Sequence, residues 1–269
     1  MIPMQLWSRL AGAKIKQNIF FLHIPKCGGS SIDNAIIEKF KTLDVRKDAR
    51  FKREDSAISA KVGGLLYNYD FENGDINDYE ILKFREFYQA YLMYKQKSYI
   101  RGHFTFSDKV YEKFKDRYIF ITILRDPVDK WLSNYFYRKN RNSNHWKIKT
   151  DLDSYINSEL SIVHGYDYSK YLGGVNEKNN YNNELQIERA KQNLDKFQIV
   201  GFLDYLDHFI KKFNLITNVN LNIPHINVSR KGRENISEDH IAKIKLLCKT
   251  DIEIYDYAKR KYGENAQND

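Results

Sequence analysis

A short apolar run, followed by a paired-glycine turn and an amphipathic segment, constrains the fold of this chain most strongly. Residues 18–24 (NIFFLHI) are β-branched or aromatic and almost continuously apolar, which is typical of a strand buried on both faces of a parallel sheet. Pro25 ends the run, and Gly28 and Gly29 follow it. Apolar residues then recur over residues 32–40 with the spacing of a helix. The sequence therefore predicts a strand–turn–helix unit.

The same alternation of strands and helices continues along the chain. Residues 99–104, 118–124 and 197–202 read as further strands, and apolar spacing predicts helices at 77–94 and 206–213. Alternating strands and helices predict an α/β fold of three layers, with a central, mainly parallel β-sheet flanked by helices.

Local signals predict where helices begin and end. Asp126 followed by Pro127 favours a helix start, because Asp caps a helix and Pro suits its first position. Ser237 is a suitable cap for a final helix, and Gly263 is a plausible stop. Turns are predicted at residues 63–64, 73–74 and 173–183.

The bulk properties limit the possible classes of protein. A length of 269 residues suits a single domain spanning 1–269. The net charge of +9 favours an anionic partner, although abundant lysine alone also accounts for it. The two cysteines, Cys27 and Cys248, form no disulfide or metal pattern. With no apolar run long enough for a membrane span and a poor signal peptide, we expect a cytoplasmic protein, or a piece of an anchored one.

The first strand–helix turn has the features of an anion site. Ligands of parallel sheets bind beyond the carboxyl ends of the strands, and the N-terminus of a helix offers unpaired N–H groups. Gly28 and Gly29 allow close approach of the backbone, while Lys26, Ser30 and Ser31 add a cation and two hydroxyls. A plain turn with a capping serine is the alternative. The lysine precedes the glycines, unlike in a Walker A motif, so magnesium–nucleotide chemistry is disfavoured.

Residues 23–31 (HIPKCGGSS) resemble the 5′-phosphosulfate loop of the Golgi-type carbohydrate sulfotransferases, in particular heparan sulfate 2-O-sulfotransferase and its bacterial relatives. The resemblance implies that the loop binds 3′-phosphoadenosine 5′-phosphosulfate (PAPS). Cys27 stands where threonine is common, and is either a packing residue or a thiol of low pKa at a helix start. The implied binding residues of the loop are Lys26, Cys27, Gly28, Gly29, Ser30 and Ser31.

Residues 123–133 resemble the family's 3′-phosphate motif, in which an arginine at a strand end and a serine eight residues later bind the donor. Arg125 and Ser133 match these two positions. Arginine presents a fixed fork of donors to phosphate, and Ser133 lies about two helical turns further on. A salt bridge from Arg125 to Asp126 or Asp129 is the structural alternative.

His103, in the segment RGHF, resembles the histidine that serves as catalytic base in the 2-O-sulfotransferase branch. A neutral imidazole can accept a proton from an attacking hydroxyl near neutral pH. A histidine with only a structural hydrogen bond is the alternative. Lys26 is then expected to neutralise the leaving phosphate. The histidines that we expect to be structural are His145, His164, His208 and His240.

A later segment resembles the family more loosely. Val200 and Gly201 match a Val-Gly segment, and the loop at 224–232 contains Arg230 and Lys231, which by resemblance reach the phosphates of the donor. A solvated basic loop is the alternative.

Taken together, the resemblance implies a P-loop-like sulfotransferase that needs no metal and has a glycan or other hydroxyl-bearing acceptor. Segments 41–98 and 138–195 match no motif, and we expect them to be insertions that bind the acceptor. Aromatic residues that are candidates for stacking on a sugar are Trp131, Tyr135, Trp146 and Tyr166. A place in the core is the alternative for all four, and we expect it for Trp131 and Tyr135. The alternatives are a P-loop kinase, a basic nucleic-acid-binding protein, for which we see no specific motif, and a sulfotransferase that binds PAPS without turnover.

Overall fold

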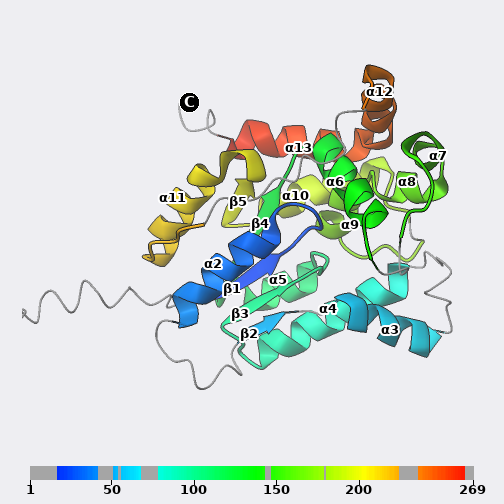
Figure 1. Ribbon diagram of the computed structural model, residues 1–269. Coiled ribbons are helices and arrows are strands. Elements are labelled where there is room, and N and C mark those ends of the chain that lie inside the picture. Colours follow the sequence, from blue (N-terminus) through cyan, green and yellow to red (C-terminus); the bar gives the residue numbers. More distant parts are fainter. Residues whose placement is uncertain are drawn as a thin grey trace, which may run out of the picture.

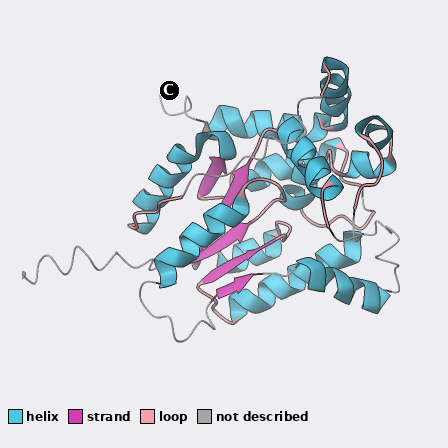
Figure 2. Cartoon of the chain, in the orientation of Figure 1, coloured by secondary structure: helices cyan, strands magenta, loops and turns pink. Residues whose placement is uncertain are grey.

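A five-stranded sheet lies at the centre of the computed structural model, with helices around it (Figures 1 and 2). The structure describes residues 17–41, 51–53, 56–67, 78–142, 147–178, 180–223 and 236–263. The strand order is β2-β3-β1-β4-β5, and each of these pairings is parallel. The strands are β1 (Asn18–Leu22), β2 (Phe51–Arg53), β3 (Tyr99–Gly102), β4 (Tyr118–Leu124) and β5 (Ile199–Phe202).

Helices alternate with the strands as the sequence predicts. Those before β4 are α2 (Gly29–Lys41), α3 (Ser56–Tyr67), α4 (Asp78–Tyr94) and α5 (Asp108–Phe114). Those between β4 and β5 are α6 (Pro127–Lys139), α7 (Leu152–Ile156), α8 (Glu159–Val163), α9 (Asp167–Gly173) and α10 (Glu184–Leu194). After β5 come a 3₁₀ turn (Leu203–Tyr205), α11 (Leu206–Thr217), α12 (Glu238–Leu247) and α13 (Lys249–Tyr262).

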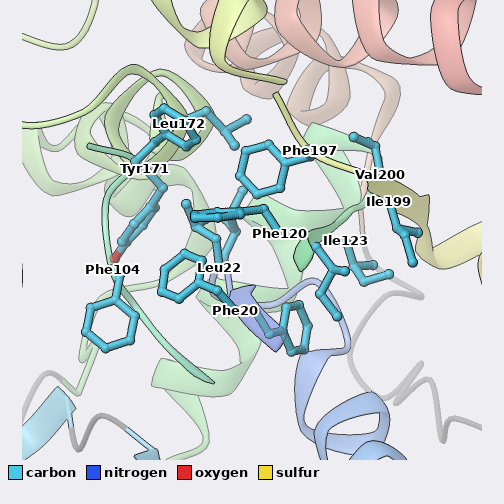
Figure 3. Packing of buried hydrophobic residues seen from close by; sticks show 14 of the residues in the cluster. Phe20, Leu22, Phe104, Phe120, Ile123, Tyr171, Leu172, Phe197, Ile199 and Val200 are labelled. Atoms are coloured by element: carbon cyan, nitrogen blue, oxygen red, sulfur yellow. The ribbon is translucent and has the colours of Figure 1, made fainter. Parts of the chain in front are cut away.

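The strands β1 and β4 at the middle of the sheet are buried on both faces, which explains why they are almost continuously apolar. All seven residues of β4 are buried. On one face, Phe20 and Phe120 lie 5.3 Å apart between ring centroids, and Phe104 and Phe197 pack beside them (Figure 3). On the other face, the hydroxyl of Tyr99 donates a hydrogen bond to Asp33 of α2. Helices on both faces make the three-layer α/β arrangement that the sequence predicts.

Most predicted boundaries agree with the structure, but two interpretations of the sequence are wrong. The paired glycines at 63–64 are not a turn, because α3 runs through them. A Cβ on Gly63 would lie 2.7 Å from Ile81, so this glycine allows close packing of α3 on α4. The predicted final helix is in fact two, α12 and α13, which meet at Cys248. This break lets Ile244 pack in the cluster around Trp131 while α13 packs against the sheet.

Capping agrees with the sequence. Asp126 accepts the N–H of Asp129 at 3.0 Å, and Pro127 is the first residue of α6. Ser237 caps α12 in a reciprocal arrangement with His240. The turn predicted at 73–74 lies outside the described residues. Within the described chain, the helices are all too short or too polar to cross a membrane.

Candidate active site

Three loops that follow adjacent strands bring the predicted residues of the site together. Lys26 follows β1, His103 follows β3, and Arg125 follows β4. Since β1 pairs in parallel with both β3 and β4, the carboxyl ends of these strands meet at one edge of the sheet. This edge is where ligands of open α/β sheets bind. Arg230 and Lys231 lie outside the described residues.

The loop after β1 is held in an unusual backbone conformation. Lys26 has a φ of 65° and Gly28 a φ of 73°. This left-handed region suits glycine but is sparsely populated by lysine, and such strain clusters at functional sites. Helix α2 then starts at Gly29, with Ser30 exposed and Ser31 partly exposed at its first turn. The loop therefore leads directly into a helix N-terminus, as the interpretation of it as an anion site requires.

Gly29 leaves room for the ring of His23. A Cβ at Gly29 would lie 2.0 Å from Cδ2 and 2.2 Å from Nε2 of His23. The imidazole of His23 is buried, and burial lowers its pKa well below the usual value, with further lowering from His103, Arg101 and Lys26. His23 is therefore neutral and fills the space between the loop and its neighbours.

We predict that Gly29→Ala destabilises the protein by about 1–3 kcal/mol, because the new methyl group overpacks against His23. Chemical denaturation measures this change. Ser30→Ala is the control, since Ser30 is the exposed neighbour on the same turn. Elsewhere in a helix Gly→Ala stabilises, so a more stable Gly29→Ala variant would show that the ring moves aside freely.

Lys26 is partly buried among cations. Its ammonium lies 3.8 Å from the ring centroid of Tyr137 on α6. Burial, with the guanidiniums of Arg125 and Arg138, lowers its pKa to about 8. An anion near Lys26 would relieve this repulsion.

Cys27 is a packing residue. Its side chain is fully buried, and its sulfur lies 3.6 Å from the hydroxyl of Tyr168. Burial raises the pKa of the thiol to about 12. The alternative of a thiol of low pKa at this position is therefore wrong, because the side chain faces the core rather than the helix terminus.

Arg125 is held from both sides. Its Nη1 donates to the carbonyl of Lys26 at 3.2 Å, rather than to Asp126 or Asp129. Tyr168 accepts the backbone N–H of Arg125 at 2.8 Å and donates to its carbonyl oxygen. The Nε of Arg125 is buried and, among the described residues, has no hydrogen-bond partner. A buried guanidinium with an unsatisfied donor fits the binding of an oxyanion.

Ser133 lies on α6, two turns after Arg125, and is partly exposed. The structure therefore places it on the helix that begins two residues after the arginine, as the sequence predicts.

His103 is stacked on His23, with ring centroids 4.8 Å apart. Its Nδ1 lies 2.7 Å from the carbonyl oxygen of His23. A carbonyl only accepts hydrogen bonds, so Nδ1 carries the proton in the neutral ring and Nε2 carries the lone pair. The ring of His23 is itself held by Arg101, because a guanidinium nitrogen of Arg101 contacts Nδ1 of His23. The backbone carbonyl of His23 thus fixes the tautomer of His103. The sequence position of His23 alone did not indicate this role.

Helix α4 secures the loop that carries His103. The buried Arg85 donates to the carbonyl of His103 at 3.2 Å and to Ser59 of α3 at 3.0 Å. One residue on, Glu86 accepts a hydrogen bond from Ser107 at 2.7 Å. Sequence reasoning missed Arg85 and Tyr168 because each belongs to a segment without a recognisable motif, and it missed Tyr137 because this residue lies just beyond the motif at 123–133.

Several other candidates are structural, as expected. His164 is buried and contacts the hydroxyl of Tyr155, and His240 caps its own helix. Trp131 and Tyr135 are buried in the cluster beneath α6 and so are not available for stacking on a sugar. His145 and Trp146 lie outside the described residues, and Tyr166 is partly buried.

Three carboxylates gather away from this site. Glu184, Glu188 and Glu253 place ligand atoms within 4.8 Å of one another, a grouping that the sequence did not suggest. Lys191 contacts Glu188 and Glu253, each at 2.6 Å, and so supplies a counter-charge.

Comparison with families of known proteins identifies the family of this chain. No curated protein matches the chain. The model of the sulfotransferase family matches residues 13–269, which includes every part of the site described above. Members of this family generally take their sulfuryl group from PAPS. This chain belongs to the sulfotransferase family, and is therefore a transferase.

Proposed function

We propose that this enzyme transfers the sulfuryl group of PAPS to a hydroxyl of a carbohydrate, with His103 as general base. The observation that carries the proposal is the placement of Lys26, His103 and Arg125 after three neighbouring parallel strands. This arrangement offers an anion cradle, a base and a phosphate-binding guanidinium at one edge of the sheet.

The donor-binding residues would divide between the two phosphates. The N–H groups at the start of α2 suit the 5′-phosphate, because this helix is 13 residues long and begins directly at the loop. Arg125 and Ser133 suit the 3′-phosphate, and the unsatisfied Nε of Arg125 supports this role. Arg230 and Lys231 remain predicted contributors by resemblance.

His103 is suited to remove a proton. Its Nδ1–H donates to the carbonyl of His23, which leaves the lone pair on Nε2. The neutral His23 against its face avoids a second positive charge in the stack. An orientation fixed by hydrogen bonding and stacking is what a general base requires.

In the transfer step, the acceptor oxygen forms a bond to sulfur while the bond from sulfur to the bridging oxygen breaks. His103 takes the proton of the acceptor hydroxyl. Lys26 neutralises the charge that appears on the departing phosphate oxygen, and its lowered pKa suits it to donate a proton there. The products are a sulfate ester and 3′-phosphoadenosine 5′-phosphate (PAP).

Both unmatched segments, 41–98 and 138–195, contribute to the surroundings of His103. Arg85 of α4 bonds to its carbonyl oxygen, and the ring of Tyr171 on α9 lies 6.3 Å from its imidazole. We therefore assign acceptor binding to these insertions within one catalytic domain. A carbohydrate acceptor and a place in the 2-O-sulfotransferase-like branch follow from the resemblance of the loop and of the Gly-His segment.

Calorimetric titration with PAP tests the donor site. We predict that Arg125→Gln weakens PAP binding about 10- to 100-fold, because it removes charge-assisted hydrogen bonds to the 3′-phosphate. Affinity for adenosine 5′-phosphate, which lacks that group, should change little. Arg117→Gln, at an exposed arginine before β4, is the matched control and should leave both affinities unchanged.

The same titrations separate the proposal from its rivals. Binding of magnesium–ATP with no binding of PAP would favour phosphoryl transfer and contradict the proposal. If Arg125→Gln weakens the binding of PAP and of adenosine 5′-phosphate equally, Arg125 does not recognise the 3′-phosphate.

A further inference from the structure

The side chain of Lys26 has a partner that the transfer step does not use. Its ammonium lies 3.8 Å from the centroid of the ring of Tyr137, within the range of a cation–π interaction. The guanidinium of Arg141 lies 5.6 Å from the same centroid. Tyr137 is 53% exposed, so the core does not require an aromatic ring at this position.

Tyr137 also has a defined relation to the donor site. It lies on α6 four residues after Ser133, so the two side chains share one face of the helix. The ring thus stands one turn beyond the expected 3′-phosphate contact and directly beside the lysine of the 5′-phosphosulfate loop.

The charges around Lys26 explain why this ring matters. The guanidiniums of Arg125 and Arg138 repel the ammonium, while His23 is neutral and the thiol of Cys27 is buried and protonated. Among the described residues, the groups that shift the pKa of Lys26 most include no carboxylate. The electron-rich face of Tyr137 therefore acts against these cations and favours the charged form of Lys26.

We propose that Tyr137 is a positioning residue, whose ring holds the ammonium of Lys26 in its charged form until the donor binds. The role in transfer rests on the proposed function, since the anion that draws Lys26 from the ring is the phosphosulfate. The contact itself exists without the donor. Tyr137 thereby supplies a protonated lysine to a site whose other cations oppose protonation.

Amine labelling measures the protonation of Lys26 directly, without donor or acceptor. Only the neutral amine reacts with acetic anhydride, so the extent of acetylation of Lys26 against pH, read by peptide mass spectrometry, gives its pKa. We predict a midpoint near pH 8 for the native enzyme. Tyr137→Phe keeps the aromatic face and should keep the midpoint. Tyr137→Leu should lower it by about 0.4–1.5 pH units.

The paired variants make the result decisive. Equal midpoints in Tyr137→Phe and Tyr137→Leu, whether both unchanged or both lowered, would overturn the proposal. Tyr137→Gln is a second non-aromatic variant and should behave as Tyr137→Leu does; a midpoint like that of Tyr137→Phe would contradict the role of the ring. Thermal melting of each variant checks that it is folded.

Repeating the labelling with PAP separates this inference from the proposed function. If the donor site is as proposed, PAP protects Lys26 in the native enzyme and in Tyr137→Phe. Absence of protection in the native enzyme would contradict the donor site, whereas the difference between the Phe and Leu variants would still stand as evidence for Tyr137.

Discussion

Replacing His103 by glutamine is expected to lower kcat about 10²–10⁴-fold, the usual contribution of a positioned general base. Glutamine can still donate a hydrogen bond to the carbonyl of His23, but it cannot accept the proton of the acceptor hydroxyl. Affinity for PAP should stay close to that of the native enzyme, because His103 is assigned to the acceptor side of the site. Transfer of labelled sulfate from PAPS to a glycan found by screening provides the rate.

The pH dependence adds a second readout of the same substitution. In the native enzyme, protonation of His103 removes the base, so kcat should fall on the acid side. The Gln variant should lose this acid limb. His208→Gln makes the same change at a partly exposed histidine of α11 and should alter neither kcat nor its pH profile. A kcat within a few-fold of native for His103→Gln, with PAP still bound, would exclude His103 as the base.

The framework of this site could be predicted from sequence because short-range signals determine it. The continuous apolar runs at β1 and β4 mark strands buried on both faces, and the residues directly after them lie at the sheet edge by necessity. Local pattern and resemblance therefore lead us to expect Lys26, His103 and Arg125 near this edge, and each follows one of the strands that end there.

The supporting residues could not be predicted, because they act through contacts between distant segments. Arg85 precedes His103 by 18 residues, and Tyr168 follows Arg125 by 43, yet each bonds to the backbone of its partner. Nothing in the local pattern around either residue indicates such a partner. Gly63 is a related case, since a close approach of α3 and α4 and a turn both favour glycine.

Replacing Lys130 by methionine is expected to destabilise the fold by about 3–5 kcal/mol, the usual cost of leaving a buried charge without its partner. Lys130 is 1% exposed. Its ammonium lies 2.8 Å from a carboxylate oxygen of Asp167 and 3.2 Å from one of Asp251, and it donates to the carbonyl of His164. The cluster joins α6, α9 and α13, so its loss affects three helices at once.

The pKa values identify Asp167 as the charge that depends on Lys130. Burial acts to raise the pKa of Asp167, but Lys130 and Lys170 outweigh it and hold the pKa well below its usual value. For Asp251, burial prevails and raises the pKa to about 7. Without Lys130, Asp251 can therefore take up a proton near neutral pH, whereas Asp167 would keep its longer ion pair with Lys170, at 3.5 Å.

Urea denaturation of the matched set distinguishes charge from packing. Lys115→Met makes the same substitution in the exposed ion pair with Glu112 and should leave the midpoint unchanged. Lys130→Met combined with Asp167→Asn removes the stranded charge and should recover part of the lost stability. If the double variant is no more stable than Lys130→Met, the loss comes from packing and not from the unpaired carboxylate.

The pH dependence of this difference has a definite sign. A carboxyl whose pKa is lowered by folding stabilises the native state above its unfolded value, near 3.9, and this contribution is lost as the pH falls through the folded pKa. Native Asp167 behaves in this way because of Lys130. In Lys130→Met the contribution is diminished or reversed, so the gap in stability between native and variant should be widest at neutral pH and narrow in acid. A gap that stays constant as the pH falls from neutral to well below 3.9 would show that the ion cluster contributes little to stability beyond its packing.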